Sequence, residues 1–225
     1  MRLGFKFAMV LGLTLAILVP LMMIRGVIQE RQGYRNEVVR DIASNVGGRQ
    51  VIGGPVLVVP FEETERAEVA GDDGIVRTVV RRKQRQWTFF PETLLVDGEL
   101  KPDIRKRGLH QVRVYQWQGF AQARFDVRIP DDSGATARRI GRPYLSYGIA
   151  DVRGLPDTPV LQVGGVRMAV AQGIGHADGP GVHARLDAPA PGARLALETR
   201  LTMRLHGTES FAMLPYAQDN ELRLR

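Results

Sequence analysis

The chain lacks cysteine altogether. It can therefore form no disulfide bond, offer no thiolate nucleophile and build none of the usual structural zinc sites. The absence does not indicate a compartment, because a protein without thiols is compatible with both oxidising and reducing surroundings.

Recognisable catalytic and metal-binding motifs are also missing. No histidine stands in HExxH or in a pair spaced i, i+4, and no serine stands in GxSxG. Adjacent carboxylates do not suggest an acid paired with a base, since neighbouring side chains of a strand point to opposite faces. The residues concerned are His110, His176, His183, His206, Ser44, Ser133, Ser146, Ser210, Glu62, Glu63, Asp72, Asp73, Asp131 and Asp132. We assign no catalytic, cofactor-binding or metal-ligating residue.

One glycine-rich stretch, GIGHADGPGVH at residues 173 to 183, contains two of these histidines. Together with Asp178, His176 and His183 could wrap a metal ion. We favour a turn with a packing role, and the spacing of GIGHADG does not fit a dinucleotide-binding loop.

Positive charge is in excess, with a formal net charge of +7 that comes almost wholly from arginine. Basic residues cluster at 77–85, 105–107 and 138–142. These clusters interleave with strand-like residues and match no nucleic-acid-binding motif. We therefore expect no nucleic-acid partner, and interpret the clusters as solvated strand faces or as contacts with anionic lipid head groups.

A single long uncharged run extends from Phe7 to Ile24. As a helix it would measure about 27 Å, close to the roughly 30 Å hydrocarbon core of a bilayer. It has no polar stripe, which argues against a buried core helix. A signal peptide is the main alternative, since Arg2 and Lys6 precede the run, but no A-x-A-like cleavage site follows. We predict a cytoplasmic tail and an uncleaved transmembrane anchor over residues 1–25, with residues 7–24 in contact with membrane lipid.

Residues 26–48 continue with helical spacing. The apolar positions Val27, Tyr34, Val38, Ile42 and Val46 lie about one turn apart, and two glycines follow. This pattern predicts a juxtamembrane helical stalk whose stripe packs on the next domain, in preference to a coiled coil.

From residue 49 onward the apolar period changes to two. It is clearest in GARLALETRLTMRLHG, residues 192 to 207, where leucines alternate with charged residues. Residues 110–130 predict a hairpin that turns at Gly119, and FFPETLLVDG predicts core followed by a hairpin turn at Asp97 and Gly98. Further strands are predicted at 55–61, 74–83, 85–90, 93–100, 144–152 and 159–170, the last with a turn at Gly164 and Gly165, and loops at 67–74, 130–137 and 173–181.

These short strands predict a mainly β fold, an antiparallel sandwich-like or curved-sheet domain over residues 49–225. It is preceded by one transmembrane helix and the stalk. The final NELRLR alternates like a strand and stops without a turn. We therefore expect that the chain is a fragment and that the domain is truncated at its C-terminal end.

Several stretches resemble the N-terminal part of the CreD-type cell-envelope integrity inner-membrane proteins of bacteria. They are LVPLMMIRGVIQERQGYRNEVVRDI, GGPVLVVPF, FFPETLLVDGELKPDIRKRGLHQVRVYQWQGFAQARFDV, RPYLSYGIADVRGL and GPGVHARL. The resemblance implies one N-terminal transmembrane helix, a large domain outside the cytoplasmic membrane and several further transmembrane helices. It also implies a role in envelope integrity or stress response, and it supplies no catalytic residues.

The charges around the anchor disagree with that topology. Arg25, Arg31, Arg35 and Arg40 follow the run, which by the positive-inside rule favours a cytoplasmic domain. Because the family places the domain in the periplasm, we expect it there, on a protein of the bacterial inner membrane.

Two functions remain open. The first is a non-catalytic interaction domain that binds an envelope protein or glycan and shows exposed apolar patches and no concave polar pocket. The alternative is an envelope enzyme acting on lipid or cell-wall precursors, which requires a cleft that gathers histidines and carboxylates from distant strands.

Overall fold

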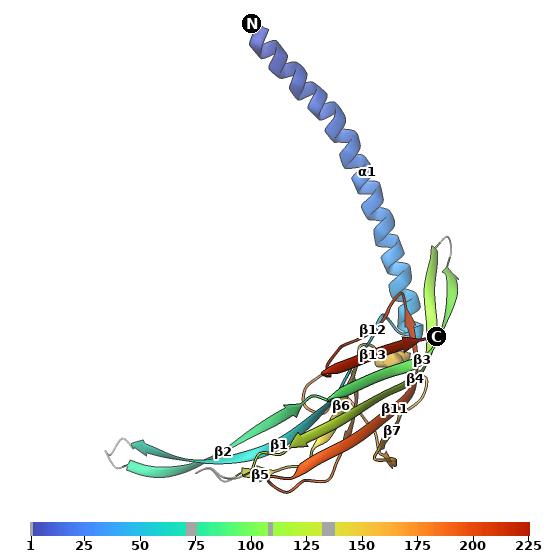
Figure 1. Cartoon of the computed structure of the whole chain (residues 1–225). Coiled ribbons are helices and arrows are strands. Elements are labelled where there is room, and N and C mark those ends of the chain that lie inside the picture. Colours follow the sequence, from blue (N-terminus) through green and yellow to red (C-terminus); the bar gives the residue numbers. More distant parts are fainter. Residues whose placement is uncertain (1, 71–75, 108–109, 132–137) are drawn as a thin grey trace.

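The computed structural model describes residues 2–70, 76–107, 110–131 and 138–225. In these parts of the chain a long N-terminal helix stands on one end of a domain built from strands (Figure 1). The prediction of a mainly β fold preceded by one long apolar helix is confirmed.

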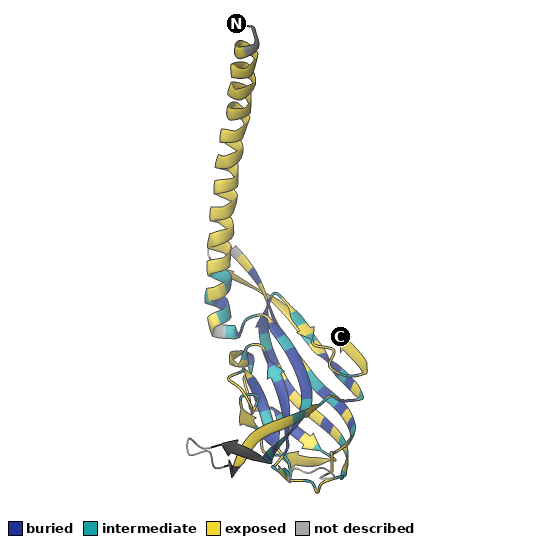
Figure 2. Ribbon diagram, turned by 90° about the vertical axis from the view of Figure 1, so that its left-hand side faces the viewer, coloured by how far each residue is buried: buried dark blue, intermediate teal, exposed yellow. Residues whose placement is uncertain are grey.

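Helix α1 extends without interruption from Arg2 to Val46, through Pro20. Every described side chain from residue 4 to residue 37 is exposed (Figure 2), and the helix is long and apolar enough to cross a membrane. It ends at Gly47, whose φ of 102° favours glycine and whose N–H donates to the Ala43 carbonyl at 2.8 Å. The glycines expected to stop the helix therefore do so.

Within the described residues the strands form two sheets. The first has the order β12-β1-β6-β10-β9, with β2 and β5 also paired to β1; the second has the order β13-β3-β4-β11-β7-β8. The first comprises β1 (Gln50–Ala70), β2 (Val76–Phe89), β5 (Arg138–Ile140), β6 (Tyr144–Ile149), β9 (Ala171–Gln172), β10 (Gly181–Arg185) and β12 (Phe211–Met213). The second comprises β3 (Thr93–Arg107), β4 (His110–Arg128), β7 (Val160–Val163), β8 (Val166–Met168), β11 (Arg194–Thr208) and β13 (Asp219–Leu224), and a short 3-10 turn, η1, covers Val152–Gly154.

Most strand pairs are antiparallel, as predicted, but two are parallel. β12 runs parallel to β1 and β13 runs parallel to β3. Both are short strands that return to a sheet edge after a connection, which local periodicity does not reveal.

The core lies between the two sheets. Leu57 and Tyr147 from the first sheet pack with Trp117, Phe125 and Leu201 from the second. Along β11 the predicted alternation is confirmed, because Leu201 and its apolar neighbours at every second position are buried while the charged residues between them are exposed. The Tyr147 hydroxyl donates to Thr199 Oγ1 at 3.1 Å and so links the sheets inside the core.

Two predicted turns are wrong. β4 passes straight through Gly119, and β3 passes straight through Asp97 and Gly98. Gly98 lies directly opposite Gly119 in the β3–β4 pair, so these glycines allow close packing inside a sheet and do not reverse the chain. The connection between the two strands follows Arg107 instead.

Other local predictions have mixed outcomes. Segments 74–83 and 85–90 form a single strand, β2, over their described part. The two-residue turn at Gly164 and Gly165 is confirmed, with positive φ at both residues and Val163 paired with Val166. Most of the loops predicted at 67–74 and 130–137 falls outside the described residues, although β1 continues to Ala70.

Candidate functional site

The histidines of the glycine-rich stretch pack around one aromatic ring. His176 and His183 lie 6.1 and 6.0 Å from the ring centre of Tyr144. His183 Nδ1 is 2.8 Å from the Gly173 carbonyl oxygen, so this side chain ties the 173–180 loop to β10. Over the residues that the structure describes, no three His, Asp or Glu side chains are grouped as metal ligands would be.

The remaining polar candidates are scattered. Glu62 pairs with Arg82 at 3.4 Å, whereas Glu63 pairs with Arg85 at 3.1 Å and Arg138 at 3.3 Å. The two glutamates thus have different partners, as expected for neighbours in a strand. His110 begins β4 and His206 lies near the end of β11, while Asp72, Asp73, Asp132 and Ser133 fall outside the described residues.

An apolar groove lies on the outer side of the first sheet. Its volume is about 500 Å³, and it runs between β1, β6, the end of β2, the 173–180 loop and the segment after β12. It is lined by Val51, Gly53, Gly54, Val56, Thr88, Phe90, Ser146, Gly148, Ile149, Ala150, Ile174, His176, Pro180, Leu214 and Tyr216. We refer to it as the apolar groove.

Glycines form the floor of the apolar groove. Gly53 on β1 pairs with Gly148 on β6, so the sheet has no side chain at this point. A Cβ on Gly53 would lie 3.2 Å from Leu214 Cδ1 and 3.6 Å from Tyr216 Cε2. The missing side chains therefore allow Leu214 and Tyr216 to lie against the strand.

Exposed apolar side chains form the wall of the groove. Phe90, Leu214 and Tyr216 have exposed fractions of 55%, 39% and 41%, and the rings of Phe90 and Tyr216 meet edge to face at 5.8 Å. No Asp, Glu, Lys or Arg is among its lining residues. Such a surface can hold an apolar side chain or hydrocarbon segment. His176 lines it as well, but no lining carboxylate or amine accompanies that histidine for acid–base chemistry.

Sequence reasoning missed this groove. The only signal was the pair of glycines in GGPVLVVPF and the glycine in YLSYGIADV, which the strand pattern alone places on no particular face. Isolated glycines inside strands mark places of close approach, but the partner that approaches comes from residues 214–216, far away in the sequence.

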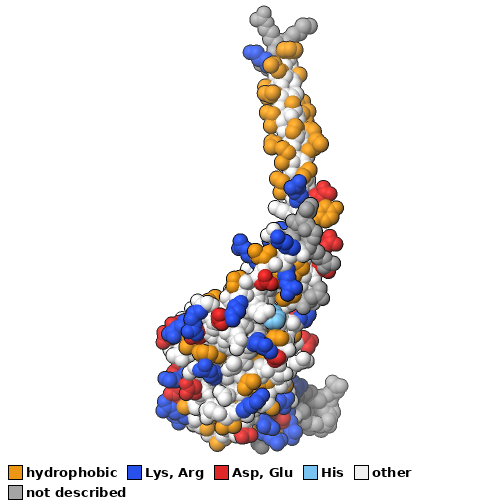
Figure 3. Space-filling view, turned by 90° about the vertical axis from the view of Figure 1, so that its right-hand side faces the viewer, with side chains coloured by type: hydrophobic (Ala, Val, Ile, Leu, Met, Phe, Trp, Pro, Cys, Tyr) orange, Lys and Arg blue, Asp and Glu red, His pale blue; other side chains and the backbone are white. Residues whose placement is uncertain are grey.

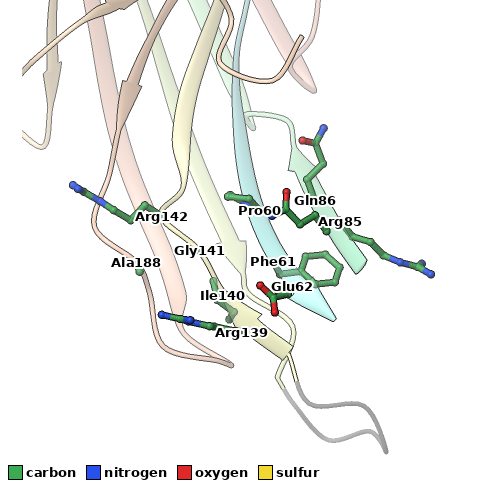
Figure 4. Close-up of a pocket in the computed structure, with 11 residues that line it drawn as sticks. Pro60, Phe61, Glu62, Arg85, Gln86, Arg139, Ile140, Gly141, Arg142 and Ala188 are labelled. Carbon is green, nitrogen blue, oxygen red and sulfur yellow. The ribbon is translucent and has the colours of Figure 1, made fainter. Parts of the chain in front are cut away.

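A second, polar groove of about 680 Å³ lies at the base of the β1–β2 ribbon (Figure 4). Arg85, Arg139, Arg142 and Glu62 are among its lining residues. The side chains of Arg139 and Arg142 point away from that of Arg85 (Figure 4), and Arg142 Nε donates to the Leu186 carbonyl at 3.3 Å. The three guanidinium groups therefore do not point toward a common site at which an anion could bind. The interaction hypothesis predicted that no concave polar pocket would be present, and this groove differs from that prediction.

The helix joins the domain first through apolar packing. Ile42, buried to 9% exposure, contacts Val112 and Val114 of β4 in a small cluster of its own. Val38 and Val46 pack at its margin. Only the last turns of the apolar stripe are used, since Tyr34 and Val27 remain exposed.

A buried amide reinforces the junction. Gln50, with no exposed surface, donates from Nε2 to the carbonyls of Asp151 and His206, each at 2.9 Å. Its Oε1 accepts from the Asp151 N–H at 3.2 Å. The Asp151 carboxylate accepts from the Gly48 N–H at 2.8 Å, and its pKa is lowered by Arg153, whose guanidinium bonds to it, and by the Gly48 amide.

An ion-pair group completes the junction. Glu209 Oε1 is 2.7 Å from Arg35 of the helix, and Oε2 is 2.9 Å from Arg49. The hydrogen bond from Arg49, then that from Arg35, lowers the pKa of Glu209. Apolar packing, a saturated amide and this carboxylate thus set the direction in which α1 leaves the domain.

Comparison with known proteins gives one consistent relationship. A family model described as "Inner membrane protein CreD" matches residues 2–225. The inner membrane protein CreD of Escherichia coli strain K12 is 29% identical over 220 residues, which cover 97% of this chain and 48% of that protein. The chain thus spans about half the length of this relative. No solved structure matches the chain.

Proposed function

This chain belongs to the CreD family of inner membrane proteins, and from this premise we propose that its β domain is a non-catalytic interaction domain in the periplasm. The family and the exposed apolar helix make it a membrane-anchored protein of the cell envelope, located in the inner membrane. In the proposed role, the domain holds an apolar part of another envelope component and thereby supports envelope integrity under stress.

The apolar groove is the observation that carries this proposal. Its wall of Phe90, Leu214 and Tyr216 is exposed, and no charged residue lines it. Exposed apolar concavities of this kind mark binding surfaces on soluble domains, because leaving them in water is unfavourable. We assign no catalytic role to any residue.

The proposal that the domain lies in the periplasm rests on the family resemblance. The arginines after the anchor favour the opposite orientation, but long domains translocate largely regardless of flanking charge. Alkaline phosphatase fused after Arg225 should be active, and a fluorescent protein that folds only in the cytoplasm should be dark at the same position. A bright cytoplasmic reporter would refute the periplasmic location.

A substitution in the groove tests the interaction role. In cells that depend on the full-length protein, Leu214→Arg should reduce protection against envelope stress, measured as entry of an otherwise excluded dye. The reason is that an apolar partner bound in the groove would have to cover the guanidinium, and removing that charge from water without a partner is unfavourable.

Val166→Arg is the matched control. Val166 is an apolar residue with 64% exposure on the β7–β8 hairpin, outside the groove. Both variants should reach the membrane in normal amounts. If Leu214→Arg protects cells as well as Val166→Arg does, the groove is not the binding surface.

A further inference from the structure

The β3–β4 hairpin extends along α1 toward the anchor. Val112 and Val114 of β4 pack on Ile42 of the helix, and the hairpin continues past this contact beside α1, on the side of the N-terminus (Figure 1 and Figure 2). We call residues 101–106 and 111–113 the hairpin flank. Its position follows from the junction, which fixes the helix on the domain.

The height of the hairpin flank above the bilayer can be estimated. Lys106 pairs with Gln111, one step beyond the level at which Val112 meets the helix. Val112 packs with Ile42 and Val38, so one step beyond lies at the level of residues 36 to 40 of α1, roughly 16 to 22 Å from Arg25 at 1.5 Å per residue. The head-group layer occupies roughly 5–8 Å of this distance, so the remaining gap is roughly 8 to 17 Å, one to two Debye lengths of 8 Å.

The hairpin flank carries positive charge and an exposed apolar side chain. Arg105 and Lys101 are 62% and 69% exposed at their side chains, Lys106 and Arg113 are exposed, and Ile104 is 54% exposed. Long basic side chains can reach several ångströms beyond their backbone. Figure 3 shows further Lys and Arg side chains around the base of the helix, where its apolar surface ends.

The strand register gives the flank two faces. Arg105 pairs with Val112 and so lies on the face that meets the helix, while Ile104 pairs with Arg113 on the other face. Asp103 is the described acidic residue on the flank, and it lies 3.8 Å from Arg105. On the same face, Lys101 lies 3.3 Å from Glu99. The excess of positive charge on the flank therefore lies on the other face, at Lys106 and Arg113.

We propose that this hairpin flank binds the anionic phospholipid head groups of the adjoining leaflet and so sets the lean of the domain over the membrane. Transmembrane helices tilt by about 20° on average, and a tilt toward the hairpin lowers it onto the head groups. Each basic side chain near an anionic surface strengthens the attraction by roughly five-fold. The proposal is independent of which side of the membrane the domain occupies.

The absence of cysteine makes a direct test possible. Ile104→Cys in the full chain is labelled with bimane, and the protein is placed in nanodiscs whose lipids carry a nitroxide on the head group. Quenching should be at least about two-fold stronger with phosphatidylglycerol present than in phosphatidylcholine alone, and 1 M salt should remove the difference, since the Debye length then falls to about 3 Å.

Matched positions control for general proximity and for folding. Val166→Cys lies away from the helix, because β7 pairs with the middle of β11 while Thr208 at the end of β11 meets Gly48. Quenching at this position should not respond to lipid charge. Adding Arg105→Glu and Lys106→Glu should remove the response at position 104, and Arg167→Glu should leave it unchanged. Equal quenching of position 104 in charged and neutral lipid, or a response no larger than that at position 166, overturns the proposal. If the charge variants fold poorly, the salt dependence of quenching in the otherwise unmodified protein still tests it.

Discussion

Glu209 is the residue at which the junction responds to pH. Its pKa is lowered by Arg49 and Arg35, so its contribution to docking is present above the ordinary pKa of glutamate and is lost as the pH falls through the lower, folded-state value. The contribution is small, below about 1 kcal/mol, because both arginines are largely exposed. Docking of α1 should therefore weaken only in acid, below about pH 4.

The measurement is the distance between spin labels at Glu30→Cys and Arg167→Cys as the pH is lowered. Glu209→Gln should show part of the acid-induced broadening already at neutral pH and a weaker change on acidification. Some acid dependence should persist, because the pKa of Asp151 is also lowered. An unchanged titration in the Gln variant would show that Glu209 does not hold the helix.

Among the secondary-structure elements, the β3–β4 pair depends most on missing side chains. A Cβ on Gly119 would clash with the Asp97 carbonyl oxygen and would lie 2.5 Å from Trp117 Cζ2 and 2.7 Å from Gly98 Cα. Gly119→Ala should therefore lower the free energy of unfolding by about 2 kcal/mol or more, since the neighbours are backbone and a buried ring that cannot move aside.

Urea unfolding in detergent, followed by tryptophan fluorescence, measures this loss. Gly33→Ala is the matched control, because a Cβ there meets nothing within 4 Å on the exposed helix. That control should be neutral or stabilise the helix by up to about 1 kcal/mol. Equal stability of the two variants would mean that β3 and β4 can separate without cost at Gly119.

In the whole molecule, we expect the small apolar contact to be the strongest of the three junction contacts that hold helix and domain together. Ile42 packs with Val112 and Val114, and Ile42→Asp would place a charge in this contact. The distance distribution between labels at Glu30→Cys and Arg167→Cys should become clearly broader, while the domain remains folded because its own core lies elsewhere.

Asn36→Asp adds the same charge at an exposed helix position and should leave the distribution narrow. The membrane lean proposed for the β3–β4 hairpin requires this rigidity, because lipid contacts at the hairpin can orient the domain only if the junction is stiff. A broad distance distribution in the unmodified protein would contradict both the stiff junction and the proposed membrane lean.

Much of the fold was predictable where the signal is local. The uncharged run at 7–24, the glycine stop at Gly47, the alternation of β11 and the turn at Gly164 and Gly165 each lie within one short segment. Periodicity and glycine conformation act over neighbouring residues, so one segment contains enough information to predict them.

The errors have a common cause. Gly119 and Gly98 read as turns in isolation, but each is required because the other lies opposite it in the sheet. The apolar groove likewise depends on Gly53 meeting residues 214–216, and the parallel returns of β12 and β13 depend on which edge is free.

The sequence by itself determined a cysteine-free chain with one membrane-length apolar helix followed by alternating strands, because composition and period are properties of the chain alone. The tertiary structure alone decided that the glycines of β1 and β6 open a groove, that Gln50 and Glu209 join the helix to the sandwich, and that a basic hairpin lies beside the domain-proximal turns of α1. These features require contacts between distant segments, and their geometry exists only once the two sheets have packed.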